Sequence, residues 1–186
     1  MPIDLKLIIL AVGLLAGSYM LAILTWSIIR PDKRLWPPKE ATDVVKLRVW
    51  AITILIFTAA FVLGVMDWNR LEWPSLARWG IGLPLIVVGN LVVWRGVHLI
   101  GMAATSGEAT GLKTDGLYKW SRNPQYVADI AILIGWGILS ASFWGLPVLV
   151  IGIAVLMVAP VAEELWLEEN YGESYRVYRS QVRRYL

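Results

Sequence analysis

Long apolar stretches separated by short polar segments are the most regular feature of the sequence. A helix that crosses a hydrocarbon layer of ~30 Å needs roughly 20 apolar residues. Five stretches have about this length, over Leu5–Ile29, Leu47–Met66, Trp79–Ile100, Tyr126–Ser142 and Phe143–Ala162. The pattern therefore predicts an all-α polytopic membrane protein with about five transmembrane helices.

The boundaries of these stretches refine the prediction. The first stretch is too long for the core of a signal peptide and has no small-residue cleavage site, so we expect a retained span. Only Ala141–Gly145 separates the fourth stretch from the fifth, which predicts a tight helical hairpin with Pro147 in the first turn of the second helix. Gly13 and Gly17 have the small-residue spacing that suits close helix packing.

Composition supports a membrane protein and removes several kinds of site. Hydrophobic residues make up 58% of the 186 residues and charged residues 17%, whereas soluble domains are about a quarter charged. The chain has no cysteine and a single histidine, His98, which excludes thiolate nucleophiles, cysteine-ligated zinc and a multi-histidine metal site. We expect no metal, and the partner that the composition indicates is a lipid bilayer rather than nucleic acid.

Basic residues are unevenly divided between the two sides that five spans define. The first loop, the segment around the end of the third stretch and the tail hold 14 of the 17 lysines and arginines. These are Arg30, Lys33, Arg34, Lys39, Lys46, Arg48, Arg95, Lys113, Lys119, Arg122, Arg176, Arg179, Arg183 and Arg184. Because cytoplasmic segments carry the excess of lysine and arginine, we expect the N-terminus outside and the C-terminus in the cytoplasm.

The segment Gly101–Asn123, between the third and fourth stretches, is polar and rich in glycine, serine and threonine. Its hydroxyls and accessible backbone N–H groups are typical of a surface that holds a polar small molecule. The same composition is also typical of a plain connecting loop, and the residues alone leave both interpretations open.

The fourth stretch begins with a capping signal and contains a carboxylate. Asn123 is suited to cap the helix and Pro124 to occupy its first turn. Asp129 lies one turn further in, where a carboxylate in a membrane helix costs a few kcal/mol unless it is paired or hydrated. Asp129 is therefore either a functional group or a side chain that reaches water at the interface.

The fifth stretch ends at Glu163 and Glu164. Pro160 cannot donate to the carbonyl of Leu156, so we expect a kink just before the two carboxylates. By itself, such a pair is typical of a solvated helix end. The residues that follow predict a C-terminal amphipathic helix at the interface, with its arginines toward anionic headgroups. Its apolar positions are Tyr171, Tyr175, Tyr178, Val182 and Tyr185, and its arginines are Arg176, Arg179 and Arg183.

Four short motifs occur in order in the second half of the chain. They are Gly116-Leu117-Tyr118, Ser121-Arg122-Asn123-Pro124-Gln125-Tyr126, Glu163-Glu164 and Tyr171-Gly172-Glu173-Ser174-Tyr175. This combination resembles the isoprenylcysteine carboxyl methyltransferase and phospholipid methyltransferase superfamily of small integral membrane enzymes. The resemblance covers about residues 95–186. We therefore expect a single integral membrane domain over 1–186, with two N-terminal spans in 1–78 and a methyltransferase core in 79–186.

The resemblance implies that S-adenosylmethionine is the methyl donor and binds at the cytoplasmic ends of the last two spans. By position, the cofactor-binding residues are Thr110, Gly111, Leu112, Lys113, Tyr118, Asn123, Pro124, Gln125, Tyr126 and Glu163. The donor carries a sulfonium and an ammonium, which a partly buried carboxylate such as Glu163 would stabilise. Its carboxylate needs N–H donors, which a helix N-terminus or Lys113 would supply.

Departures from the family pattern bear on the acceptor. Asn123 replaces a frequent histidine, as in the phospholipid-type members, and the glutamine that prenylcysteine methyltransferases place after the third span is absent. Those enzymes also carry an arginine one turn before the glutamate, where this chain has Ala159. Arg95 or Arg122 would have to replace it beside a carboxylate acceptor, which disfavours the prenylcysteine type.

The implied reaction is a direct displacement, so the protein would contribute alignment and desolvation. A carboxylate acceptor needs no base, whereas an amine or thiol must lose a proton, for which Asp129, Glu164 and His98 are the candidate catalytic residues. We expect the acceptor to be a membrane lipid or a hydrophobic small molecule. Carboxyl or thiol methylation is the alternative reaction, and a non-catalytic membrane scaffold or transport accessory is the alternative of another class.

Overall fold

A computed structural model of the chain describes residues 3–38, 42–105 and 111–186. In these ranges it contains helices and no strand. The elements are α1 (Ile3–Ile29), η1 (Pro31–Lys33), α2 (Asp43–Met66), α3 (Ser75–Ala77), η2 (Arg78–Gly82), α4 (Leu83–Thr105), η3 (Gly116–Lys119), α5 (Pro124–Ser140) and α6 (Leu146–Gln181).

The helices confirm the all-α polytopic membrane fold. Four helical segments are long and apolar enough to span a membrane, Asp4–Ile29, Asp43–Met66, Ser75–Leu99 and Leu146–Gln181. The predicted fourth span is the apolar helix α5, which at 17 residues is shorter. The five predicted stretches thus correspond to five helices, of which the third includes α3 and η2 ahead of α4.

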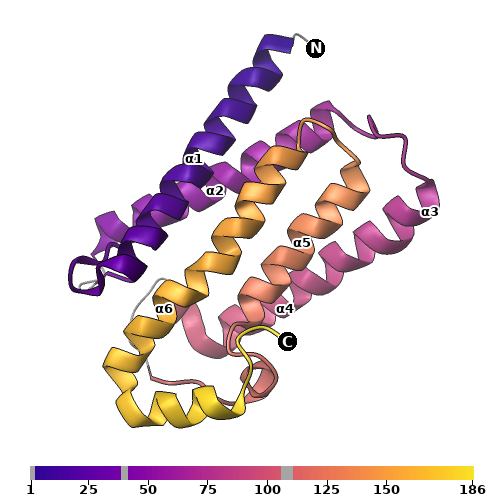
Figure 1. The fold of residues 1–186 in the computed structure, drawn as a ribbon. Helices are drawn as coiled ribbons and strands as arrows, with labels where there is room; N and C mark the ends of the chain where they lie inside the picture. The colour runs from indigo at the N-terminus through magenta and orange to yellow at the C-terminus, as the bar shows by residue number, and fades with distance from the viewer. Residues whose placement is uncertain (1–2, 39–41, 106–110) are drawn as a thin grey trace.

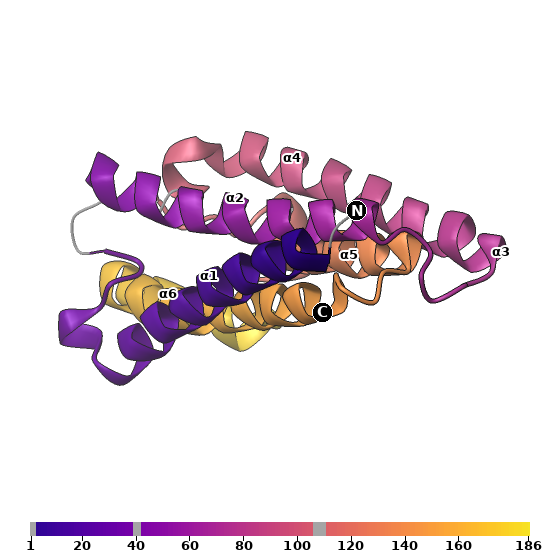
Figure 2. The same cartoon turned by 90° about the horizontal axis from the view of Figure 1, so that it is seen from above.

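Small residues let the helices approach closely. In Figure 1, α6 lies between α1 and α5, with α4 beyond α5, and Figure 2 shows α2 beside α1. A Cβ atom on Gly13 would lie 2.9 Å from the Ala59 methyl group, and one on Gly17 would lie 2.7 Å from Ile151. A Cβ on Gly89 of α4 would lie 2.8 Å from the carbonyl oxygen of Ala128 in α5. These contacts confirm close packing at Gly13 and Gly17.

One end of the bundle is held by a buried carboxylate, and we call it the Asp67 end. Asp67 follows α2 and accepts hydrogen bonds from Lys6 Nζ at 2.7 Å, Ser142 Oγ at 3.2 Å and the backbone N–H groups of Phe143 and Trp144 at 3.0 and 3.1 Å. It therefore ties the start of α1 to the turn between α5 and α6. That turn is the predicted tight hairpin, with Pro147 in the first turn of α6.

The α1–α2 segment, the α4–α5 segment and the C-terminal tail lie at the other end (Figure 1), which we call the basic end. Helix α6 stays helical through Pro160 and changes direction at Gly172, whose φ of 51° and ψ of −125° are non-helical. In the tail that follows, Tyr175, one of the predicted apolar positions, is buried. Arg176 and Arg179, however, form ion pairs with Glu168, so the protein already neutralises these two predicted headgroup contacts in part.

Candidate functional site

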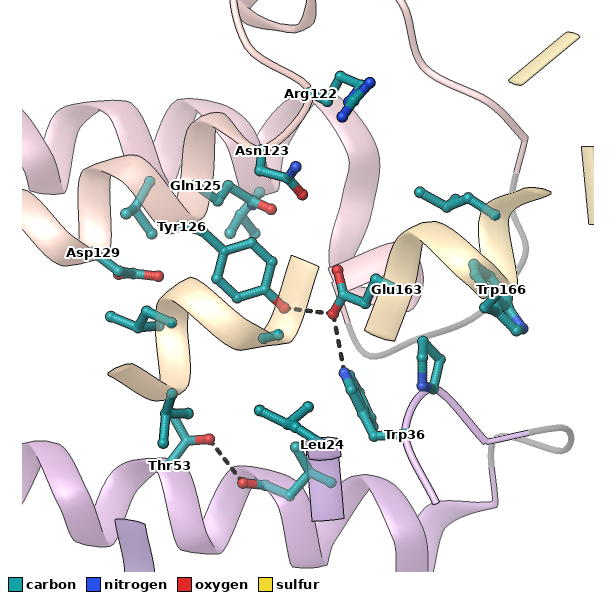
Figure 3. Close-up of a pocket in the computed structure, with 18 of the residues that line it drawn as sticks. Leu24, Trp36, Thr53, Arg122, Asn123, Gln125, Tyr126, Asp129, Glu163 and Trp166 are labelled. Carbon is teal, nitrogen blue, oxygen red and sulfur yellow. Dashed lines mark hydrogen bonds between the residues drawn. The ribbon is translucent and has the colours of Figure 1, made fainter. Parts of the chain in front are cut away.

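A cavity of about 440 Å³ opens inside the bundle near the basic end. Its wall includes residues of α1, α2, α4, α5 and α6 and of the α4–α5 segment. Figure 3 shows polar side chains from the start of α5 facing Glu163 of α6, with Trp36 of the α1–α2 segment on another side. The cavity therefore joins polar groups of the basic end to the apolar interior.

Glu163 is the best-connected carboxylate of the cavity wall. The Tyr126 hydroxyl and the Trp36 Nε1–H, at 3.0 Å, both donate to its Oε1 (Figure 3). Its Oε2 has no hydrogen-bond partner among the described residues. Two neutral donors thus fix the side chain on one oxygen and leave the other for a ligand.

Trp36 reaches Glu163 because its loop folds back onto α1. The buried Ser27 hydroxyl oxygen accepts the backbone N–H groups of Leu35 and Trp36, each at 3.0 Å. Just upstream, Arg34 forms an ion pair with Glu169 of α6. Trp36 lies outside every motif that the sequence offered, and its separation of 127 residues from Glu163 left no local pattern that could have identified it.

Glu164, next to Glu163, has a different environment. It is 4% exposed and accepts from Arg122 Nη2 at 2.9 Å and from Arg184 Nε and Nη2 at 2.9 and 2.8 Å. It does not belong to the cavity wall. The interpretation of this pair as a solvated helix end is therefore wrong, because the C-terminal tail folds back and covers it with arginine side chains.

Three residues of the cavity wall carry buried polar atoms that have no partner in the described structure: Gln125 Nε2, Arg122 Nε and the Tyr175 hydroxyl. Buried polar atoms are normally hydrogen-bonded, because an unpaired one costs about 1–3 kcal/mol. All three atoms are closed off from solvent by neighbouring atoms, so they are unpaired polar groups packed beside the cavity and do not face its open space.

The described part of the α4–α5 segment lines the cavity at the basic end. The Gly111 N–H donates to the Tyr171 hydroxyl at 3.0 Å, and Leu112 and Lys113 line the cavity. Tyr118 also lines it, and its carbonyl accepts the Tyr178 hydroxyl at 2.7 Å. Burial raises the pKa of the Tyr118 hydroxyl well above its ordinary value of 10, so Tyr118 is a neutral hydrogen-bonding group.

Of the other candidate residues from the sequence, Asn123 lines the cavity, whereas Pro124, Arg95 and His98 do not. Asn123 lines the cavity, but its side chain donates to the Arg184 carbonyl at 3.1 Å instead of capping α5. Pro124 is buried in the first turn of α5 and lies outside the cavity wall. Arg95 and His98 are exposed on α4 and also lie outside it. Thr110 falls outside the described residues.

The first two helices contribute to the apolar part of the wall. It includes Met20 and Leu24 of α1 and Val49, Ile54 and Phe57 of α2. No motif marked these positions, because cavity-lining and lipid-facing residues are equally apolar in a membrane helix. The first two spans thus contribute directly to the candidate site.

Comparison with known proteins gives one family and two curated relatives. The family model for phospholipid methyltransferases matches residues 77–174. The steroid 5-alpha-reductase DET2 of Solanum lycopersicum is 29% identical over 106 residues, which are 56% of this chain and 41% of that protein. The nickel-cobalt-cadmium resistance protein NccN of Alcaligenes xylosoxydans xylosoxydans is 24% identical over 132 residues, 69% of this chain and 58% of that protein. The chain therefore covers less than two thirds of either relative, and no solved structure matches it.

The matched residues 77–174 make up more than half of the chain and contain α4, α5 and Glu163. Of the four motifs that carried the resemblance, this range contains three completely and all but the last residue, Tyr175, of the fourth. The chain therefore belongs to the phospholipid methyltransferase family.

Proposed function

We propose that this protein transfers a methyl group from S-adenosylmethionine to a lipophilic, membrane-associated acceptor. The observation that carries the proposal is the cavity in which Glu163, paired among the described residues on one carboxylate oxygen only, lies between the polar segment of the basic end and an apolar wall inside the bundle. Family membership supports a membrane methyltransferase in general.

The residues that line the cavity fit S-adenosylmethionine. When bound, this cofactor supplies an electrophilic methyl group on a positively charged sulfur. Glu163 would stabilise its positive charges, because a carboxylate attracts cations strongly in a cavity of low dielectric constant. Lys113, which lines the cavity from the α4–α5 segment, would hold its carboxylate. Gly111, Leu112, Tyr118, Asn123, Gln125 and Tyr126 would form the remaining walls, and Thr110 adjoins them in sequence.

The residues outside the cavity receive no role in methyl transfer. Glu164 is held by Arg122 and Arg184, and His98 and Arg95 lie on an exposed face of α4. Of the three candidate bases, Asp129 lines the cavity, whereas Glu164 and His98 do not.

We place the basic end on the cytoplasmic side, with the N-terminus outside. The support is the positive-inside rule, since the segments with 14 of the 17 lysines and arginines belong to this end. A soluble donor and a membrane acceptor would meet here, where the cavity joins polar and apolar walls.

A second candidate function comes from the tomato relative, whose name describes a steroid reductase. Reduction would require a hydride donor such as a nicotinamide dinucleotide, whose phosphates need cations or backbone N–H groups. Of the described residues on the cavity wall, Lys113 and Arg122 are cationic, and Arg122 already binds Glu164. The carboxylates of Glu163 and Asp129 line the same cavity, so methyl transfer is the better-supported function.

Equilibrium binding of labelled S-adenosylmethionine to the purified, detergent-solubilised protein tests the proposal. We expect saturable binding that the Glu163→Gln variant weakens about 30-fold, because loss of a charge-assisted contact is worth about 2 kcal/mol. The exposed Glu173→Gln variant is the matched control and should bind like the wild type. Absence of binding at millimolar donor, or displacement by NADPH and not by S-adenosylhomocysteine, contradicts the proposal.

Transfer of label identifies the acceptor class. Incubation of the protein in its native membrane with methyl-labelled donor, followed by lipid extraction, should give a labelled lipophilic product. Amine, carboxylate and thiol acceptors separate by the stability of the product to base and to reduction. A protein that binds donor but labels nothing in the extract would favour the non-catalytic scaffold.

A further inference from the structure

Asp129 is the carboxylate of the cavity that no contact explains. It lies on α5 three residues after Tyr126, on the same helix face. In Figure 3 both side chains project from α5 toward the space enclosed by α2 and α6. Its carboxylate has no hydrogen bond or ion pair with any described residue. An unpaired carboxylate within a membrane helix costs a few kcal/mol, and such residues mark functional sites.

The described groups around Asp129 offer it no counter-charge. The cationic residues among the described cavity wall are Lys113 and Arg122, which precede α5 in the segment at the basic end. Arg122 donates to Glu164 and to the Arg179 carbonyl. The nearby polar residue of α2 is Thr53, whose hydroxyl donates to the Val49 carbonyl at 2.9 Å. Asp129 therefore faces the cavity with both oxygens available for a ligand.

Much of the cavity wall is apolar. Met20, Leu24, Ile56 and Phe57 line it from α1 and α2, and Ala159 of α6 adds only a methyl group. An apolar ligand body fits such a wall through burial of its surface. A ligand group that carries negative charge would be repelled by Asp129 and would find no cation there.

We propose that Asp129 binds the reacting group of the acceptor, and that this acceptor is a lipophilic amine without a phosphate group. The inference rests on the proposed methyl transfer for its chemistry but not for the binding preference that it predicts. The ammonium of the amine pairs with Asp129, and its hydrocarbon part occupies the wall formed by α1 and α2. A phospholipid amine would place its phosphodiester near the Asp129 carboxylate, whereas the two cations of the described wall, Lys113 and Arg122, belong to the segment that precedes α5.

Asp129 also completes the proton balance of the reaction. An ammonium nitrogen has no free electron pair, so the amine first gives one proton to the Asp129 carboxylate. The freed pair of the nitrogen forms the bond to the methyl carbon while the carbon–sulfur bond breaks and its electron pair stays on sulfur. The positive charge moves from sulfur to the methylated nitrogen, and Asp129 returns its proton to water at the basic end.

A set of probes with one hydrocarbon chain and different head groups tests this proposal. Dodecylamine, dodecanoic acid, dodecanethiol and didodecanoyl phosphatidylethanolamine are titrated into the full-length protein in detergent, without donor. We expect the wild type to bind dodecylamine about 10-fold more tightly than the other probes, as one buried charge pair would give. Asp129→Asn should lose this preference and keep its affinity for labelled S-adenosylmethionine. The exposed Asp32→Asn variant at the same end is the control and should keep both.

Every outcome of these titrations either supports or overturns the assignment of Asp129 as the amine site. Tighter binding of any other probe by the wild type, or equal binding of dodecylamine by Asp129→Asn and wild type, overturns the assignment. If Asp129→Asn does not fold, the ranking of the four probes on the wild type decides alone. If the protein binds no S-adenosylmethionine but still prefers dodecylamine through Asp129, the proposed function fails and the amine site stands. Transfer of labelled methyl to dodecylamine, lost at least 10-fold in Asp129→Asn, supports both.

Discussion

At the Asp67 end of the bundle, both oxygens of one buried carboxylate have partners: Lys6 on one, and Ser142 and two backbone N–H groups on the other. At the basic end, Glu163 has two donors on Oε1 and none among the described residues on Oε2. Glu164, one residue further, has arginine donors on both oxygens.

The difference separates structural from functional polar groups. When the protein itself supplies partners to both oxygens of a buried carboxylate, the carboxylate needs no ligand and its hydrogen bonds stabilise the folded state. A group with an unused acceptor gains its last partner from a ligand, at some cost to the stability of the free protein. Asp67 and Glu164 belong to the first kind, and Glu163 and Asp129 to the second.

Glu164→Ala should produce the largest loss of stability. It leaves the buried Arg122 guanidinium and that of Arg184 without a counter-charge, and removing one partner of a buried ion pair costs about 3–5 kcal/mol. Glu163→Gln should cost less than about 1 kcal/mol, because the amide oxygen still accepts from Tyr126 and Trp36. Chemical unfolding in detergent compares the two variants. Equal losses at the two positions would contradict the division.

Asp67→Asn should lose about 2 kcal/mol of unfolding free energy, since one charged acceptor of several hydrogen bonds is replaced by a neutral amide. Its affinity for labelled S-adenosylmethionine should stay within about twofold of the wild type, because the Asp67 end lies away from the cavity. Glu72→Gln, an exposed carboxylate at the same end, is the control for stability. A large drop in donor affinity in Asp67→Asn would show that the two ends are coupled.

Trp36→Phe should weaken donor binding about fivefold, the equivalent of about 1 kcal/mol for one hydrogen bond. The ring still fills its place, but Glu163 Oε1 keeps Tyr126 as its one remaining donor. Trp26→Phe is the matched control, because Trp26 Nε1 donates to the Lys33 carbonyl of the same segment at 3.1 Å without touching the cavity. Equal affinities of Trp36→Phe and wild type would exclude a positioning role for Trp36.

Acid should weaken the Asp67 end by the smallest amount. Burial alone would raise the pKa of Asp67, but its hydrogen bonds to Lys6 and Trp144 and the Lys6 charge together lower the pKa below its ordinary 3.8. Since the folded-state pKa lies below the unfolded one, Asp67 stabilises the protein above about pH 4, and this stabilisation is lost as the pH falls further. We expect the free energy of unfolding, measured between about pH 6 and about pH 3, to decline more steeply in the wild type than in Asp67→Asn. Parallel curves would contradict the assignment.

The helices were largely predictable, because a helix in a bilayer must be long and apolar whatever its neighbours are. The boundaries were less so. Helix α2 begins at Asp43 rather than Leu47, since the Thr42 hydroxyl accepts the Val45 N–H and caps a polar first turn. The third span begins at Ser75, where α3 and η2 continue into α4.

The candidate site was predictable only where short motifs recorded it. Tyr126 and Gln125 share the start of α5, and the resemblance included both with Glu163. The unequal roles of Glu163 and Glu164 were not predictable, because adjacent helical residues point about 100° apart and the sequence does not say which direction meets arginine. Asn123 shows the same limit, since a residue typical of a cap uses its side chain on the Arg184 carbonyl.

The amino-acid sequence was enough to predict a membrane protein of five long apolar helices with a tight turn before the last, and to indicate the family that its motifs resemble. These properties follow from local composition, helical periodicity and short-range spacing. Three features emerged from the packing of the chain: Trp36 holds Glu163, the tail covers Glu164, and Asp129 faces the cavity with no partner among the described residues. The physical reason is that each of these states depends on contacts between residues far apart in the chain, where hydrogen bonding and burial are set by packing and not by neighbours in sequence.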